Sequence, residues 1–320
     1  MDAVVVREGG ELGLESYPDP EPAVGEVVVE LRAAALNRRD LGVCRGVAGY
    51  ATPFVPGSDG AGVRRDTGEE VVILPSLRWG AGDAAPGEGF EILGGPTDGT
   101  YAQLVRVPAE NLYPKPSRFS WEEAAATPLA ALTAYRALFT RGRLHSGETV
   151  LVLGAGSGAS TFAVSLARQE GARVLVTTSS DEKLERARDL GAAGVDYTGG
   201  DWVEEVRALS GGAGVDLVVD SVGSTWQQSL SCLKAGGRCV VFGATGGPQV
   251  ELGIRPFYFG QHSLLGTTMG SPRDFASLLR VIDMGRWKPV IDSVRPLGEV
   301  AAAHSRMEAG EHFGKLVLTP

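Results

Sequence analysis

A glycine-rich turn at residues 150–160, VLVLGAGSGAS, constrains the fold most, because it lies directly between an apolar run and a helical pattern. The pattern predicts a short buried strand at 149–153 and a helix at 157–170 that Gly171 ends. The same order repeats along the chain, with strands expected at Arg173–Thr178, 195–197, Val215–Asp220 and 237–242, and helices expected at Trp202–Leu209, at 226–233 and after Ser179, which stands at capping-box spacing from Glu182. Such alternation is typical of an α/β protein with a doubly wound parallel sheet.

The turn itself carries the pattern G-x-G-x-x-A, formed by Gly154, Gly156 and Ala159. In a dinucleotide-binding (Rossmann) unit the first glycine turns the chain tightly, the second admits a pyrophosphate, and the small third residue lets the helix pack closely. Phosphates would lie against the helix N-terminus at Ser157 and Gly158, where unpaired N–H groups and the helix dipole favour negative charge. A glycine turn without a ligand is the alternative interpretation.

The tip of the second strand indicates which dinucleotide is bound. A NAD site expects Asp or Glu there, about 20 residues after the glycine turn, to accept the ribose hydroxyls. This chain offers Thr178, Ser179 and Ser180 instead, with Lys183 one turn into the next helix. Because hydroxyls and a lysine tolerate a 2′-phosphate, the sequence predicts NADPH (NADP) as cofactor. Asp181 leaves an alternative open, since its carboxylate can turn toward the ribose or cap the helix.

The first third of the chain has a different pattern. Strands are expected at 26–36, 69–74 and 101–107, separated by turns rich in Gly and Pro, which indicates a compact β-rich domain. Residues 78–99 are glycine-rich without regular periodicity and predict a surface loop. Prolines at 114–116, just before a helical pattern, indicate a crossing between domains.

Composition excludes several classes of partner. A formal charge of −9 without a dense Lys/Arg run argues against nucleic acid or an anionic membrane surface. No apolar run reaches the length of about 18 residues that a membrane span needs, and the N-terminus does not resemble a secretory signal. Three cysteines without a CxxC pair offer no disulfide or zinc framework, so we expect a cytoplasmic protein and a buried Cys44.

Four further segments, taken with the glycine turn, resemble the medium-chain dehydrogenase/reductase superfamily over essentially the whole chain. They are VPGSDGAG (55–62), DGTYAQLVRVP (98–108), PLAALTAYRAL (128–138) and HFGKLVLTP (312–320). The resemblance implies a GroES-like β-rich domain of residues 1–118, completed by 270–320, and a Rossmann domain of residues 119–269. It also implies an active site in a cleft between the domains, and a homodimer that extends the parallel sheet through a strand near 263–267.

Within that superfamily, the resemblance separates this chain from the zinc-dependent members. Those members carry cysteine, histidine-glutamate and often a second cysteine where this chain has Asn37, Ser58, Asp59 and approximately Leu129. A zinc site needs nitrogen or sulfur donors, so no metal is expected. The zincless members, quinone oxidoreductases and enoyl reductases, imply hydride transfer from NADPH to a small electrophilic substrate, a quinone, enone or other activated alkene. An alcohol dehydrogenase-like carbonyl reductase, and a non-catalytic NADPH-binding protein of this fold, remain alternatives.

The resemblance also implies roles for individual residues. Asn37 would orient the nicotinamide ribose or the substrate oxygen, or hold a turn; Asp40 would fix that turn, and Thr133 would lie near the nicotinamide. Tyr50 is a candidate proton donor or a packing residue at the rim, and Arg39 would meet an acidic substrate or remain solvated. The remaining residues expected along the cofactor are Tyr197, Val222, Gly243, Ala244, Thr245, Gly266, Thr267, Thr268 and Lys315.

Overall fold

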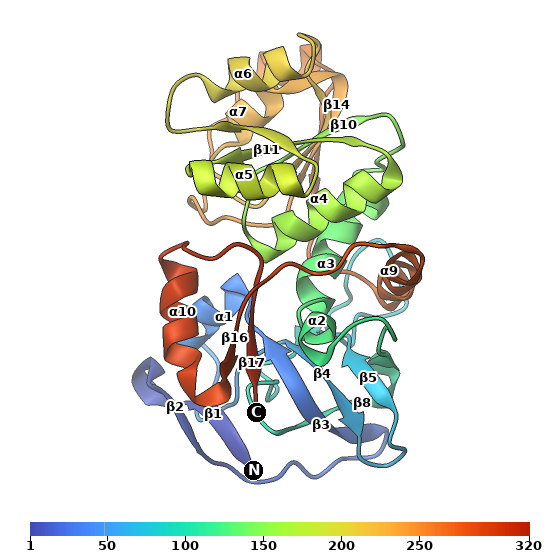
Figure 1. The fold of residues 1–320 in the computed structure, drawn as a ribbon, viewed down its shortest axis with the longest axis vertical. Helices are drawn as coiled ribbons and strands as arrows, with labels where there is room; N and C mark the ends of the chain where they lie inside the picture. Colours follow the sequence, from blue (N-terminus) through green and yellow to red (C-terminus); the bar gives the residue numbers. More distant parts are fainter. Residues whose placement is uncertain (48) are drawn as a thin grey trace. The chain divides into compact units, whose positions relative to one another are not determined.

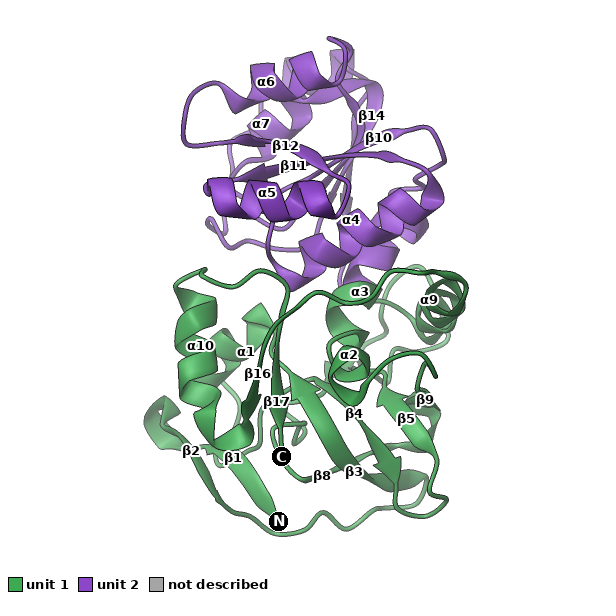
Figure 2. Ribbon diagram, in the orientation of Figure 1, with its two compact units in different colours: residues 1–132, 270–320 green, residues 133–269 purple. Residues whose placement is uncertain are grey.

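The computed structural model describes residues 1–47 and 49–320, and the chain divides into two compact units. Unit 1 comprises Met1–Leu132 and Gly270–Pro320, and unit 2 comprises Thr133–Met269 (Figures 1 and 2). The predicted boundary after residue 118 lies earlier than this division. Residues 119–132 belong to unit 1 because their helix α2 (Trp121–Ala125) packs against strands of the β-rich sheet.

Unit 2 contains a six-stranded sheet in the order β12-β11-β10-β13-β14-β15, and every neighbouring pair is parallel. The chain starts at the centre of the sheet, moves outward to one edge, then returns and moves to the other. This order creates a switch point between β10 and β13, as in doubly wound dinucleotide-binding sheets, and confirms the predicted α/β class. The strands are β10 (Thr149–Val152), β11 (Arg173–Thr178), β12 (Ala193–Asp196), β13 (Val215–Asp220), β14 (Leu233–Val241) and β15 (Ser263–Gly266).

Four helices of unit 2 follow the predicted pattern, with one cap misplaced, and a fifth, α8, was not predicted from the sequence. They are α4 (Gly158–Glu170), α5 (Asp181–Asp189), α6 (Trp202–Leu209), α7 (Trp226–Ser231) and α8 (Ile254–Phe259). Gly171 ends α4 with a left-handed φ of 89°. The predicted capping box of Ser179 and Glu182 is wrong: Ser180 caps α5, and its side chain accepts the backbone N–H of Lys183.

Unit 1 is built on a seven-stranded sheet in the order β16-β17-β3-β4-β5-β9, with β8 also paired to β3. The long strand β3 pairs antiparallel with β8 through its first half and with the C-terminal strand β17 through Ala34 and Ala35. The C-terminal segment is therefore part of the first sheet. The strands are β3 (Glu26–Ala35), β4 (Asp59–Arg64), β5 (Glu70–Ile73), β8 (Leu104–Pro108), β9 (Leu112–Pro114), β16 (Ile291–Pro296) and β17 (Lys315–Thr319), and a separate hairpin joins β1 (Asp2–Val6) to β2 (Leu12–Ser16).

The glycine-rich segment 78–99 has more structure than the sequence predicts. Its strand β7 (Glu91–Ile92) pairs with β6 (Ser76–Leu77), and the Trp79 side chain is buried with its indole N–H donating to the carbonyl of Gly82. The Phe90 ring packs edge-on against Trp79. Sequence periodicity cannot reveal this arrangement because each strand is only two residues long.

The helices of unit 1 are α1 (Arg38–Cys44), α2, α9 (Pro272–Met284) and α10 (Val300–Glu308), while α3 (Pro128–Tyr135) starts in unit 1 and runs into a π-helical turn at Arg136–Arg141 in unit 2. Among the helices of unit 1, α2 packs against β3 and β4, and α10 packs against β16 and β17. Across the described residues, no helix combines the length and the apolar character needed to cross a membrane.

His304 on α10 provides a test of how unit 1 packs. Its ring lies edge-on to buried Tyr101, with centroids 6.0 Å apart, and its buried Nε2 finds no hydrogen-bond partner among the described residues. Burial lowers the pKa of His304 from 6.5 to about 4. Because the unfolded chain then takes up the proton first, unit 1 should lose stability as the pH falls from 6.5 toward 4, by up to about 3 kcal/mol.

The His304→Phe variant, which keeps the ring but cannot be protonated, should lose much less stability over the same pH interval. Urea unfolding at a series of pH values measures the difference. His145, which is exposed, supplies the control variant His145→Gln, which removes a histidine outside unit 1. If the unsubstituted protein and His304→Phe lose stability in parallel as the pH falls, protonation of His304 is not the cause of the loss.

Candidate functional site

The turn after β3 positions the first group of candidate residues. Asn37 precedes α1, and the Asp40 carboxylate in the first turn of that helix accepts the Asn37 backbone N–H at 2.8 Å. The same oxygen, Oδ2, accepts the Tyr101 hydroxyl at 2.8 Å. Asp40 is 1% exposed, and burial raises its pKa. Asp40 Oδ2 therefore holds the turn, in the role that the resemblance implies, while Oδ1 accepts no hydrogen bond in the described chain.

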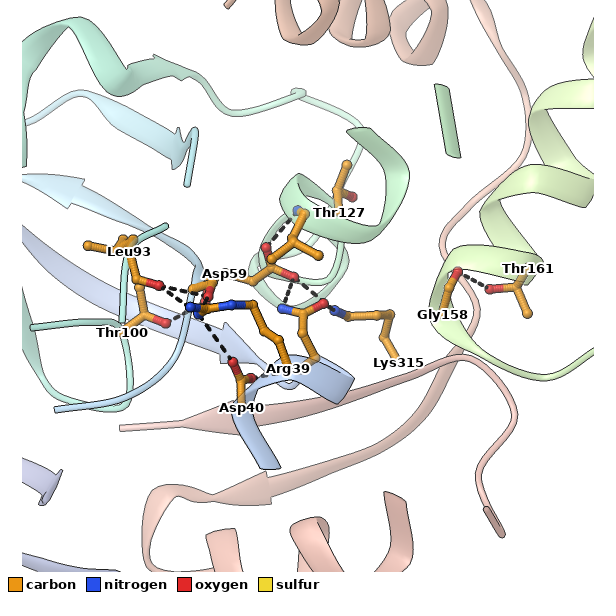
Figure 3. Close-up of polar contacts among 12 residues, drawn as sticks. Arg39, Asp40, Asp59, Leu93, Thr100, Thr127, Gly158, Thr161 and Lys315 are labelled. Atoms are coloured by element: carbon orange, nitrogen blue, oxygen red, sulfur yellow. Dashed lines mark hydrogen bonds and ion pairs between the residues drawn. The ribbon is translucent and has the colours of Figure 1, made fainter. Parts of the chain in front are cut away.

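The side chain of Asn37 belongs to a buried polar cluster with Asp59 on β4 and Lys315 on β17. The Lys315 ammonium donates to Asn37 Oδ1 at 2.7 Å and to Asp59 Oδ2 at 2.8 Å, and Asn37 Nδ2 donates to the same carboxylate oxygen at 2.9 Å. The backbone N–H of Leu129 donates to the other oxygen, Asp59 Oδ1, at 2.7 Å. Figure 3 shows the Lys315 side chain reaching toward Asp59. Three strands or turns far apart in sequence thus share one charge-assisted network.

The network places limits on what Asn37 can do. Its amide oxygen accepts from Lys315, and one of its two amide hydrogens goes to Asp59, so a single N–H remains for any ligand. Asp59 is fully buried and Lys315 is 2% exposed. Burial raises the pKa of Asp59, while the Lys315 ammonium acts in the opposite direction. The geometry therefore makes Asn37 a hydrogen-bond donor whose orientation is fixed, because Lys315 binds its amide oxygen.

The same positions do not fit a zinc ion. Asn37 and Asp59 are bonded to an ammonium, and the Ser58 hydroxyl donates to the carbonyl of Leu93 at 2.7 Å while accepting from Arg39 at 2.7 Å. Tetrahedral zinc sites are built from thiolate, imidazole and carboxylate ligands, and here a lysine already supplies the positive charge. Among residues 1–47 and 49–320, no three His, Cys, Asp or Glu side chains are grouped to hold a metal.

Tyr50 lies beside this turn with its ring packed against the protein. The ring is edge-on to Phe54, with centroids 6.2 Å apart, and it covers Gly95, where an added Cβ would come within 2.5 Å of Tyr50 Cε2. Cys44 belongs to the same apolar cluster, and burial raises the pKa of its thiol to about 12. The structure thus gives Tyr50 a packing role, while its proposed role as a proton donor stays a prediction.

In unit 2 the glycine turn has the geometry of a phosphate cradle. Gly154 and Gly156 have φ of 73° and 105°, a region that favours glycine, and an added Cβ at Gly154 would meet nothing within 4 Å. Ser157 caps α4, and the Ser160 hydroxyl donates to the Gly154 carbonyl at 2.7 Å. The turn is therefore braced from the protein side and open on the other, at the N-terminus of a 13-residue helix.

The expected cofactor residues that end or follow strands of unit 2 lie at the same edge of its sheet, because every parallel strand ends there, whereas Asn37 and Lys315 belong to unit 1. Thr178 ends β11, and its carbonyl accepts the N–H of Tyr197, which brings the half-exposed tyrosine beside the predicted ribose end. Val222 follows β13, and its N–H donates to buried Asp220. Gly243, Ala244 and Thr245 follow β14, Gly266 ends β15 and is followed by Thr267 and Thr268, while Thr133 is buried in α3.

One of these residues has an unsatisfied group. The Thr267 hydroxyl is buried without a hydrogen-bond partner in the described chain, a condition that costs free energy unless a ligand or water supplies the partner. Together with the open glycine turn, this orphaned hydroxyl indicates that the carboxyl edge fits a polar ligand such as a dinucleotide. Gly154, Gly156, Ser157 and Gly158 would hold its phosphates, and Thr267 would meet a polar group farther along.

Sequence reasoning missed three parts of the site. It did not pair Asp59 with Lys315, which lie 256 residues apart, nor Arg39 with Ser58. It also missed the Thr177 hydroxyl, which accepts the Gly154 N–H at 3.1 Å and holds the glycine turn in place. A lysine at the start of an otherwise apolar final strand was the one available signal, because a charge in such a position needs a buried partner.

Comparison with known proteins gives a consistent result for both units. Residues 23–117 match the family model of the alcohol dehydrogenase GroES-like domain, which confirms that the β-rich domain is GroES-like. Residues 158–284 match the family model of the zinc-binding dehydrogenases. A zinc-type alcohol dehydrogenase-like protein of Schizosaccharomyces pombe is 34% identical over 329 residues, spanning 96% of this chain and 95% of that protein.

Solved structures resemble the whole chain. A structure described as an NAD-dependent alcohol dehydrogenase is 40% identical and superposes with a TM-score of 0.94 over 100% of both chains. The quinone oxidoreductase from Thermus thermophilus, solved alone and with NADPH, is 31% identical with a TM-score of 0.83, again over 100% of both chains.

Breaking the buried pair of Asp59 and Lys315 should destabilise unit 1 strongly. Lys315→Met leaves a buried carboxylate without its counter-ion and should lower the free energy of unfolding by about 3–5 kcal/mol. Adding Asp59→Asn removes the unpaired charge, so the double variant should be more stable than Lys315→Met alone. Urea unfolding of the four proteins in this cycle measures the coupling between the two side chains.

The surface pair of Arg45 and Glu308 supplies the matched control, because its side chains are 57% and 51% exposed. The cycle of Arg45→Met and Glu308→Gln should give a coupling of at most about 1 kcal/mol. A coupling for Asp59 and Lys315 no larger than this value would show that the buried pair does not hold the sheet together.

Proposed function

Because the chain belongs to the medium-chain dehydrogenase/reductase superfamily, we propose that it is an NADPH-dependent, zinc-independent oxidoreductase that reduces a quinone, an enone or another activated alkene. The observation that carries the zinc-independent part is the position of Lys315. Its ammonium is bonded to Asn37 and Asp59, where the zinc-dependent members carry ligand residues. A fixed cation and hydrogen-bond donors thus replace the metal at this point of the fold.

The cofactor part of the proposal rests on unit 2. When bound, a nicotinamide cofactor supplies the hydride. The open turn at Gly154 receives the phosphates, and Thr178, Ser179 and Ser180 leave the ribose end without the carboxylate that NAD sites use. Lys183 in the first turn of α5 favours a 2′-phosphate. This preference distinguishes the proposal from the NAD-dependent activity named for one structural relative.

The acceptor part rests on chemistry that needs no metal. A conjugated carbonyl is already polarised, so donors near its oxygen are enough to stabilise the charge that develops there. Asn37 has one free N–H for such an oxygen or for the nicotinamide ribose, and Lys315 and Asp59 hold its amide in one orientation. Thr133 is proposed beside the nicotinamide and Tyr50 at the rim of the acceptor site.

Two further features belong to the proposal. We expect a homodimer in the cytoplasm, formed through β15, which is the last strand of the six-stranded sheet. Tyr258 and Phe259 of the adjacent α8 are 52% and 66% exposed, which favours a covered surface in that region. An alcohol dehydrogenase-like carbonyl reductase and a non-catalytic NADPH-binding protein are the alternatives that the following measurement separates.

The purified protein should oxidise NADPH in the presence of quinones or enones, followed by the loss of absorbance of the reduced nicotinamide. Simple aldehydes and ketones are the control acceptors, and faster turnover with them would favour the carbonyl reductase. Extended dialysis against a chelator should leave the rate unchanged and elemental analysis should find no stoichiometric zinc. Tight NADPH binding without turnover on any acceptor would favour the non-catalytic alternative.

Lys183 should determine the preference between the two cofactors. Lys183→Glu places a negative charge beside the predicted 2′-phosphate and should raise the KM for NADPH by tenfold or more, while the KM for NADH changes little. Lys183→Arg keeps the charge and should preserve the preference. Steady-state kinetics with both cofactors measure the ratio, and an unchanged ratio in Lys183→Glu would remove this residue from the site.

A further inference from the structure

Arg39 is a cation at the candidate active site whose hydrogen-bonding capacity is only partly used. It follows Asn37 by two residues in the first turn of α1, and its side chain is 20% exposed. Its Nη1 donates to the Ser58 hydroxyl at 2.7 Å and to the Leu93 carbonyl at 3.2 Å (Figure 3). No group in the described part of the chain accepts a hydrogen bond from its Nε or Nη2.

The nearest carboxylate, Asp40, forms a long ion pair with this guanidinium but accepts no hydrogen bond from it. Asp40 Oδ1 lies 3.8 Å from Arg39 Nη1, too far for a hydrogen bond, and this oxygen is buried without any hydrogen-bond partner in the described chain. The other oxygen of Asp40 is used by Asn37 and Tyr101. Asp59, the second acidic residue of the cluster, is paired with Lys315. When both acids are ionised, the charges of Asp40 and Asp59 balance those of Arg39 and Lys315. The unused donors of Arg39 therefore result from the geometry of the cluster and not from an excess of positive charge.

The hydrogen bonds made by Nη1 hold the Arg39 guanidinium in one orientation. The Ser58 hydroxyl accepts from Nη1 and donates to the Leu93 carbonyl, and this carbonyl also accepts from Nη1. A guanidinium has five N–H donors in a rigid fork, and three of them remain on Nε and Nη2. Such an edge suits an oxygen that carries negative charge, because hydrogen bonds to charged groups are the stronger ones.

From this arrangement we propose that Arg39 is a further catalytic residue that binds a negatively charged oxygen of the acceptor. The inference rests on the proposed function. It names a feature that the acceptors share, which is an oxygen that carries a negative charge or gains one during the reaction.

In an enone, hydride adds to the β-carbon, the alkene electrons form the α-carbon to carbonyl-carbon double bond, and the carbonyl electrons move to oxygen. NADPH becomes NADP+, and a proton from water then adds at the α-carbon.

Two sources of negative charge are possible and an experiment separates them. Acetylacrylate is an enone with a carboxylate, and its methyl ester is the same enone without that charge. If Arg39 binds the developing enolate oxygen, Arg39→Gln should lower kcat/KM for both acceptors by roughly a hundredfold or more, mainly through kcat. If Arg39 binds the carboxylate, only acetylacrylate should lose efficiency, through a raised KM. Either result supports the proposal.

The matched control is Arg45→Gln, which removes an arginine at the other end of the same helix, where Arg45 is exposed and pairs with Glu308. This variant should keep the kinetics of the unsubstituted protein. Arg39→Lys keeps the positive charge but lacks the planar guanidinium, so its kcat/KM should lie between those of Arg45→Gln and Arg39→Gln. Thermal unfolding of each variant separates a loss of folding from a loss of function.

A binding measurement keeps the test independent of turnover. Calorimetric titration of acetylacrylate into the protein loaded with NADP+, which cannot deliver hydride, should show weaker binding to Arg39→Gln than to the unsubstituted protein if the carboxylate is the ligand. Failure of the unsubstituted protein to turn over any acceptor would overturn the proposed function, while the titration would still report on Arg39. Kinetics and binding of Arg39→Gln within about twofold of Arg45→Gln would overturn the role of Arg39.

Discussion

The ion pair between Asp59 and Lys315 is the interaction on which the candidate site of unit 1 depends. It joins β4, near the start of the chain, to β17 at its end, and it holds the amide of Asn37 between the two. A charge this deeply buried is costly unless it is paired and hydrogen-bonded. Asp59 meets that condition with hydrogen bonds from Lys315, Asn37 and the Leu129 backbone. The C-terminal strand is therefore needed both for the sheet and for the site.

In unit 2 the arrangement of parallel strands has the corresponding role. All six strands run in the same direction, so the segments that follow them meet at one edge. That edge presents the open turn at Gly154, the unpartnered hydroxyl of Thr267, and the N-terminus of α4. An acidic chain can thus offer a site for a phosphate-bearing ligand without a cluster of basic residues, because backbone N–H groups and helix dipoles supply the complementary charge.

The two sites differ in how much the sequence revealed. The glycine turn was predicted because it depends on a local pattern of strand, glycine and helix, and its geometry follows from residues within one short segment. Asn37 and Asp40 became candidates through the resemblance to a family, but the partners of Asn37 were not predicted. The cap at Ser180 instead of Ser179 and the short strand at Glu91–Ile92 were also missed, since both are decided by packing over only a few residues.

By itself the sequence determined the α/β class, most of the alternation of strands and helices in the second half, and the position of the glycine turn. These properties follow from hydrophobic periodicity and from the backbone freedom of glycine, which act over neighbouring residues. Only the tertiary structure decided that Lys315 neutralises Asp59, that Asn37 keeps a single free N–H, and that Arg39 retains an open edge. Those outcomes depend on which residues far apart in sequence share one buried volume, and burial sets the cost of every unpaired charge and hydrogen bond there.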